Sequence, residues 1–252
     1  MALLVTDAIV LHQSDYLESS RILRLATREA GVQSVLARGA RSSRKRFGSA
    51  VDLFAQGQAQ LQTKPGRDLH TLVSFDVTRS RPGLATDLGR FTAASALTEC
   101  VLRVVHDEAA PGVYDGVLSG LDAIAAAESP DTVAVALGAL WRLVSDVGFT
   151  PVLDRCAECQ APIGTDEDST FSHLAGGTLC ARCGPRTPGG RRLPASARQT
   201  ILAWLDGRQP QPTVPESRAH QRLLREFLEQ HLTDGRELRA FSAWELGVYG
   251  QV

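Results

Sequence analysis

Two pairs of cysteines have the spacing of a metal site. They are Cys156-x2-Cys159 and Cys180-x2-Cys183, with 20 residues between the pairs. Two thiolates from each Cys-x-x-Cys turn can meet at one tetrahedral zinc ion, while the intervening residues form a small hairpin or ribbon. Four sulfur ligands leave zinc no open position for water or substrate. The spacing therefore predicts one structural Zn²⁺, which stabilises a segment with few apolar residues of its own.

The neighbouring residues disfavour a catalytic interpretation of these cysteines. His-Asp-Glu at 106–108 followed by the first pair superficially resembles the zinc deaminase signature, but Arg155 stands where that signature has proline. The second pair also completes a four-thiolate site without a histidine. A thioredoxin-like motif needs one pair beside a βαβ unit, and here two pairs occur without one. We expect His173, between the pairs, to be a surface residue rather than a ligand.

The apolar content indicates a folded cytoplasmic protein. The chain has 252 residues and is 43% hydrophobic, which is enough for two or three modest domains. Asp7 interrupts the apolar N-terminal run and no run of about 18 apolar residues follows, so we expect neither a secretory signal nor a membrane span. The fifth cysteine, Cys100, lies in an apolar stretch and is expected to be a buried small hydrophobe.

A second group of residues has the chemistry of phosphate binding. The stretch LARGARSSRKRFGSA, residues 36–50, carries five cations and no acidic residue. Guanidinium groups bind phosphate bidentately, so such a loop can follow a nucleic-acid backbone, and a neighbouring aromatic ring can stack on a base. The simpler alternative is a solvated loop that keeps the protein soluble. The candidate DNA contacts are Arg38, Arg41, Arg44, Lys45, Arg46 and Phe47.

The distribution of charge favours the phosphate-binding interpretation. Residues 1–81 carry 12 Arg and Lys against 7 Asp and Glu, and residues 82–252 carry 15 against 21, so the two parts have net charges of +5 and −6. A basic N-terminal part joined to an acidic remainder indicates that the N-terminal part faces a polyanion.

The first 81 residues have the pattern of a small β-barrel. Short segments alternate apolar and polar residues or have β-branched centres, and Gly or Pro interrupts them at 28–31 and 64–68. Closure removes the exposed edges of such a sheet, which favours an oligonucleotide-binding (OB) barrel over residues 1–81. The five expected strands are 7–13, 20–27, 32–39, 55–63 and 68–78.

The residues after 81 have helical periodicity, with apolar residues at spacings of three and four. The helices that follow the cysteine segment need a partner for their apolar stripes, and the helices before it provide one. We therefore predict an α+β multidomain fold. Its parts are an N-terminal OB-fold barrel at 1–81, an α-helical domain at 82–153 and 194–252, and an inserted four-cysteine zinc ribbon with its following loop at 154–193.

The chain has none of the common motifs for nucleotide hydrolysis or acyl transfer. It contains no Gly-x4-Gly-Lys-Ser/Thr phosphate loop, no Gly-x-Ser-x-Gly elbow and no His-Glu-x-x-His pair. We therefore expect a binding protein without catalytic residues rather than an enzyme.

Three stretches together resemble the bacterial DNA repair and recombination protein RecO family. They are GARSSRKRFGSAVDLFAQGQAQL, LWRLVSDVGFTPVLDRCAECQAP and REFLEQHLTDGRELRAFSAW, and the likeness runs over most of the chain. The resemblance implies an N-terminal OB domain, an α-helical domain and, in many members, a zinc ribbon. It also implies a nucleoid-associated protein that does not turn over a small molecule.

The resemblance also implies partners. Proteins of this family bind single- and double-stranded DNA, anneal complementary strands, and act with RecR, in some cases with RecF, to load RecA onto DNA coated by single-stranded DNA-binding protein (SSB). Some members hold the acidic C-terminal tail of SSB, which here would need a local basic patch near Arg103, Arg142 or Arg225. A zinc-containing RNA-binding or transcription-associated adaptor is the alternative that the residues leave open.

Overall fold

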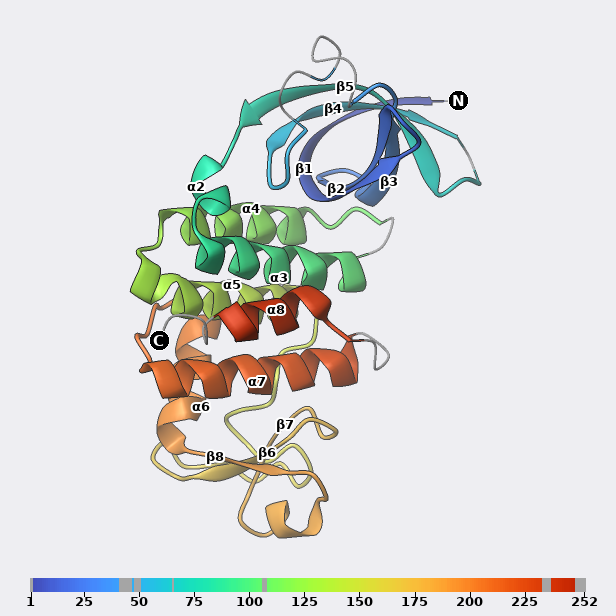
Figure 1. Ribbon diagram of the computed structural model, residues 1–252. Helices are drawn as coiled ribbons and strands as arrows, with labels where there is room; N and C mark the ends of the chain where they lie inside the picture. Colours follow the sequence, from blue (N-terminus) through green and yellow to red (C-terminus); the bar gives the residue numbers. More distant parts are fainter. Residues whose placement is uncertain are drawn as a thin grey trace.

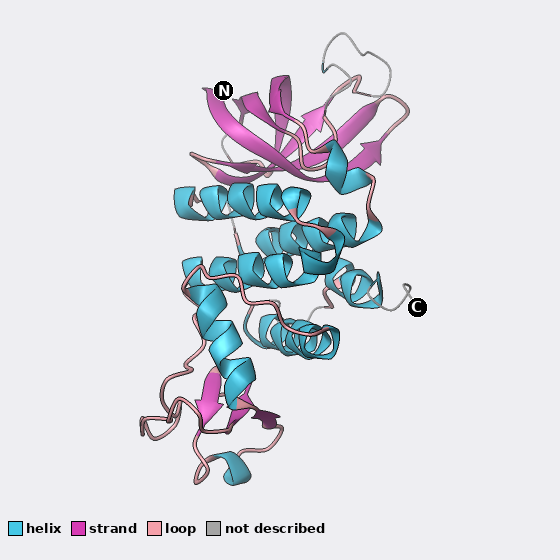
Figure 2. Ribbon diagram, turned by 90° about the vertical axis from the view of Figure 1, so that its left-hand side faces the viewer, coloured by secondary structure: helices cyan, strands magenta, loops and turns pink. Residues whose placement is uncertain are grey.

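The computed structural model describes residues 2–40, 47, 51–64, 66–105, 108–232 and 237–247. These residues form a β-barrel, a helical domain and a small sheet, with the barrel and the small sheet at opposite ends of the helical domain (Figure 1, Figure 2). This arrangement confirms the predicted α+β fold with an N-terminal barrel, a helical domain and an inserted cysteine-containing unit.

All five expected strands are present, and they close into a barrel in the order β1-β2-β3-β5-β4. Alternate residues such as Leu23, Leu25 and Val35 fill its interior, because successive side chains of a strand point to opposite faces. The parallel pairing of β3 with β5 completes the closure, and a five-stranded Greek-key barrel of this kind is the OB architecture. The strands are β1 (Ala2–Tyr16), β2 (Ser20–Thr27), β3 (Gly31–Ala37), β4 (Gln56–Thr63) and β5 (Leu69–Arg79).

The helical domain is a stack in which α3 and α4 lie next to the barrel and α6 and α7 lie toward the small sheet (Figure 1). Asp87 caps α3 by accepting the backbone N–H of Arg90 at 2.8 Å. Thr213 and Glu216 form a capping box at the start of α7. The helices are α2 (Pro82–Ala85), α3 (Leu88–Val104), α4 (Pro111–Ala126), η1 (Ser129–Asp131), α5 (Thr132–Asp146), α6 (Ala195–Leu205), α7 (Val214–His231) and α8 (Arg239–Gly247).

One continuous apolar core joins the three units. Ile9, Ala26 and Val32 of the barrel belong to the same buried cluster as the helices, and so does Phe171 of the small sheet. Cys100 is 2% exposed within this core, as predicted for a buried hydrophobe, and burial raises the pKa of its thiol to about 12. In the part of the chain that the structure describes, we find no helix with the length and apolar content of a membrane span.

Candidate metal centre and nucleic-acid interface

The four cysteines predicted to bind metal lie together. The Sγ atoms of Cys156, Cys159, Cys180 and Cys183 are all within 4.8 Å of one another. Cys159 Sγ and Cys180 Sγ are 3.8 Å apart, which matches the edge of a tetrahedron whose sulfurs each lie about 2.3 Å from a central zinc ion. None of the thiols is in a disulfide. The cluster is therefore a closed four-sulfur set that fits a tetrahedral metal.

Two tight backbone turns direct these thiols toward one another. In the first turn, Cys156 N–H donates to Ala161 O at 2.8 Å, and Gln160 N–H donates to Cys156 O at 2.9 Å. Gln160 has φ of 61°, so the chain reverses through a left-handed residue. In the second turn, Gly184 N–H donates to Cys180 O at 2.9 Å. The local backbone thus directs the four sulfurs toward one point.

The surroundings shift the pKa values of two thiols in opposite directions. The backbone N–H of Ala161, followed by the Arg182 guanidinium, lowers the pKa of Cys159 to about 6. Removal from water, followed by the hydrogen bond with Cys159, raises the pKa of Cys183 to about 12. A divalent cation at the centre of the cluster would stabilise the thiolate form of each cysteine.

A small sheet carries the cysteine turns and packs on the helical domain. Its strands are ordered β7-β6-β8, and the Phe171 ring of β6 lies 6.1 Å from the Phe227 ring of α7. The backbone of Gly177 passes so close to Val152 that a Cβ on residue 177 would lie 2.3 Å from Val152 O. The elements are β6 (Ser169–Ser172), β7 (Gly177–Leu179), η2 (Gly184–Arg186) and β8 (Arg191–Leu193).

A buried arginine of α6 holds the loop that leads into this sheet. Arg198 is 1% exposed, and its guanidinium donates at 3.1 Å to each of the carbonyls of Leu153, Thr165 and Glu167. It also donates to the carbonyl of Gly164. The fork of guanidinium donors suits several acceptors at once, so this one side chain fixes the cysteine unit to the helical domain.

The prediction that His173 lies on the surface is wrong. Its side chain is 13% exposed, and its Nε2 lies 3.0 Å from a carboxylate oxygen of Glu226 on α7. Burial lowers the pKa of His173, and the charge of Glu226 opposes that shift. His173 is not part of the four-cysteine cluster. It packs the sheet against α7, with its ring centroid 5.2 Å from that of Phe171.

The structure describes two of the six candidate DNA contacts. Arg38 is exposed directly after β3, and it forms no ion pair with any carboxylate of the described residues. Phe47 is 3% exposed and belongs to the barrel core, so its ring fills the barrel and has no free face for base stacking. That burial corrects the proposed stacking role. The remaining candidates, Arg41, Arg44, Lys45 and Arg46, lie outside the described residues.

Arg38 follows the outer face of β2 and β3. On that face Arg24 pairs with Ser34, and Ile22 pairs with Leu36. These residues alternate with the buried interior positions, and Arg38 continues the same alternation just beyond the strand. The face of strands 2 and 3 is the surface on which OB barrels bind oligonucleotides.

Other arginines of the barrel are bound to carboxylates of the helical domain. Arg28 makes a two-pronged contact with Asp115, at 2.8 and 3.1 Å. Arg79 and Arg81 both contact Asp122, at 2.7 and 2.6 Å. These three cations fix the barrel to α4, so they are not available for phosphate.

Two of the three arginines expected near a basic patch have acidic neighbours. Arg225 is 3.0 Å from Glu229 and 3.2 Å from Glu245. Burial lowers the pKa of Arg142, which lies near an acidic residue of its own helix. Arg103 differs, because it lines an open cavity between the barrel and the helices.

Family comparisons match almost the whole chain. Residues 1–81 match "Recombination protein O N terminal", and residues 85–239 match "Recombination protein O C terminal". The chain belongs to the recombination protein O family. This confirms the resemblance and gives the protein a role in DNA repair and recombination.

Curated members of the recombination protein O family align along most of their length. The DNA repair protein RecO of Anaeromyxobacter sp. (strain K) is 36% identical over 244 residues, which is 92% of each chain. That of Anaeromyxobacter sp. (strain Fw109-5) is 34% identical over 240 residues, 92% of this chain and 91% of the relative. That of Syntrophotalea carbinolica is 35% identical over 179 residues, 71% of this chain and 68% of the relative.

Sequence reasoning did not single out Arg24 or Arg198. Arg198 shares one face of α6 with the apolar Ile201 and Leu205, and a charged residue in such a stripe signals a buried partner. Arg24 occupies an outward position of β2, a strand that also contains Ser20, Arg21 and Thr27, so no local pattern marked it out. Only Arg198 carried a signal, as one charged residue in an apolar stripe.

Proposed function

We propose that this member of the recombination protein O family is a non-catalytic recombination mediator. It binds single- and double-stranded DNA and anneals complementary strands. With RecR, and in some contexts RecF, it loads RecA onto DNA coated by SSB, whose acidic tail it also binds. The observation that carries this proposal is the OB barrel whose β2–β3 face ends at the exposed Arg38, just before the basic segment 41–46. The cations that can bind phosphate therefore follow, in the sequence, a barrel face that can bind bases.

We assign the DNA-binding role to residues 1–81, and one structural Zn²⁺ to Cys156, Cys159, Cys180 and Cys183 in the 154–193 unit. Support for zinc is the all-thiolate donor set and the 3.8 Å sulfur separation. When bound, the ion supplies folding free energy to a unit whose sheet is very short. The metal unit lies far from the barrel (Figure 1), so its role is to shape that end of the protein rather than to contact DNA on the barrel.

The DNA-binding part of the proposal is tested with a loop variant, Arg41→Ala with Arg44→Ala and Arg46→Ala. Each phosphate contact with single-stranded DNA adds about 0.7 to the slope of log affinity against log salt, so the loop variant should bind more weakly with a slope lower by about 2. A charge-matched variant, Arg186→Ala with Arg208→Ala and Arg222→Ala, removes three exposed cations away from the barrel. It should bind like the wild type.

The result that refutes this assignment is an unchanged affinity and slope in the loop variant, because the basic segment would then be only a solvated loop. A preference for RNA over DNA, together with no strand annealing, would favour the adaptor function instead.

A further inference from the structure

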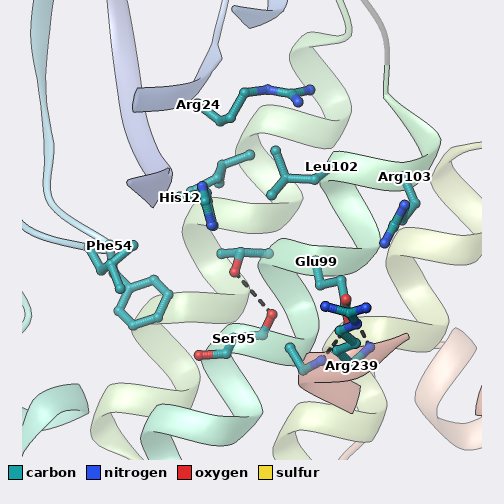
Figure 3. A pocket seen from close by; sticks show the side chains of 12 residues that line it. His12, Arg24, Phe54, Ser95, Glu99, Leu102, Arg103 and Arg239 are labelled. Carbon is teal, nitrogen blue, oxygen red and sulfur yellow. Dashed lines mark hydrogen bonds between the residues drawn. The ribbon is translucent and has the colours of Figure 1, made fainter. Parts of the chain in front are cut away.

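A cavity of about 460 Å³ opens where the barrel meets α3 and α8. Its apolar side is formed by Leu11, Leu53, Phe54 and Leu102, and its polar side chains come from four separate elements, β1, β2, α3 and α8 (Figure 3). Small-molecule sites occupy roughly 300–1,000 Å³, so the cavity has the size of a site for one small group such as a nucleotide.

The cavity is positively charged. Arg24 of β2, Arg103 of α3 and Arg239 of α8 line it, and none of them has a carboxylate partner among the described residues. The acidic residue in the lining is Glu99, whose carboxylate accepts the backbone N–H groups of Arg239 at 3.0 Å and Ala240 at 2.8 Å. Glu99 therefore neutralises the N-terminus of α8 and leaves the guanidinium groups available to an anion.

The apolar wall of the cavity is held in a fixed conformation. Phe54 has φ of 66°, which a non-glycine residue adopts only when its surroundings impose it. Its N–H donates to Val10 O at 2.9 Å, and Arg81 donates to its carbonyl at 2.7 Å. Its ring packs edge-on against Phe91, with centroids 5.9 Å apart. The wall is thus formed before any ligand arrives.

The cavity continues the β2–β3 face of the barrel. Arg24 lies opposite Ser34. Ser34 is four residues before Arg38, a separation of about 13 Å along an extended strand. On the other side of Arg24, Ala26 and Val32 are buried under the helical domain. The exposed part of the face therefore runs from Arg38 to Arg24 and ends in the cavity.

We propose that the cavity binds one nucleotide of a single-stranded DNA held on the β2–β3 face, with the base against the half-buried Leu53 and Leu102 and its phosphate between Arg24 and Arg103. This inference rests on the proposed DNA-binding function of the barrel. The cavity is continuous with the exposed β2–β3 face between Arg24 and Arg38, which favours DNA over an acidic peptide. A short acidic peptide could bind to the three arginines of the cavity alone and would not need that face. The path would place the DNA between the barrel and the helical domain.

Binding of a fluorescein-labelled 15-nucleotide oligothymidine tests the cavity. Arg24→Ala and Arg103→Ala should each weaken affinity about tenfold and lower the salt slope by about 0.7. Leu102→Trp should weaken binding by filling the cavity without changing the net charge. Arg208→Ala, which removes an exposed cation of the α6–α7 linker, should bind like the wild type. Circular dichroism and thermal unfolding check that each variant is folded, and the two arginine variants decide the test if Leu102→Trp unfolds.

Three outcomes overturn the proposal, and they separate it from the proposed function. If Arg24→Ala and Arg103→Ala bind DNA like Arg208→Ala while the loop variant is weakened, the cavity proposal fails and the barrel function stands. If the wild type itself has no affinity for the oligonucleotide, both fail. If the two arginine variants keep their DNA affinity but lose binding of a labelled hexa-aspartate peptide, the cavity is a peptide site.

Discussion

Replacing Arg198 by methionine should loosen the cysteine unit from the helical domain. Methionine keeps much of the apolar stem but removes four hydrogen bonds to carbonyls. The bond to Leu153 O is buried, and leaving that acceptor unsatisfied costs about 1–3 kcal/mol. The other three acceptors share the two N–H groups of Arg198 Nη2 and lie on an exposed loop, where they can turn to water, so together they contribute about 1–3 kcal/mol. We expect the free energy of unfolding to fall by about 2–6 kcal/mol.

Urea unfolding of the zinc-loaded protein measures this loss, and transfer of zinc to a colorimetric chelator should also be faster in Arg198→Met. Gln199→Met is the matched control, because Gln199 is the next residue of α6 and makes only one long bond, 3.4 Å, to Thr165 O. It should lower the free energy of unfolding by less than about 1 kcal/mol. A wild-type urea midpoint and zinc-transfer rate in Arg198→Met would refute the reasoning.

Three further predictions concern metal, pH and packing. The wild type should keep one zinc per chain after dialysis against a weak chelator, and Cys180→Ser should lose it, as measured by elemental analysis. Burial lowers the pKa of His220 from 6.5 to about 4. As the pH falls, the histidine of the unfolded chain is therefore protonated before that of the folded chain, and the free energy of unfolding should decrease by about 2 kcal/mol from pH 7.5 to pH 5. A Cβ at Gly120 would lie 2.9 Å from Leu97 Cδ2, so Gly120→Val should cost about 1–3 kcal/mol, seen as a lower melting temperature.

Each of these predictions has a control within the chain. Cys100→Ala removes a thiol outside the cluster and should keep its zinc, whereas a wild type that is folded and metal-free would contradict the metal assignment. His220→Gln should flatten the dependence of stability on pH, and an unchanged pH dependence would show that another group causes it. A Cβ at Gly112 meets nothing within 4 Å, so Gly112→Val should be tolerated much better than Gly120→Val.

Local pattern was sufficient to predict the strands, the long helices and the cysteine cluster. Alternation along 20–27 specifies which side chains face the barrel interior, and the turn geometry of a Cys-x-x-Cys pair brings two sulfurs close together within four residues. Both signals depend on neighbours in the chain, so a single sequence contains them.

Contacts between distant parts of the chain could not be predicted in this way. Phe47 follows four cations and two serines, and only the closed barrel shows that its ring completes a core. His173 is mostly buried because Glu226 of α7, more than 50 residues later in the chain, lies against it. The start of α8 also depends on a distant residue, because Glu99 of α3 accepts the backbone N–H groups of Arg239 and Ala240.

The central claim, that an OB barrel with the basic segment 41–46 in its sequence makes this protein a DNA recombination mediator, is tested most directly by annealing of complementary oligonucleotides coated with SSB. The wild type and the charge-matched variant should accelerate annealing to the same extent, and the loop variant should be close to the spontaneous rate. Equal acceleration by the loop variant, or no acceleration by the wild type, would contradict the account.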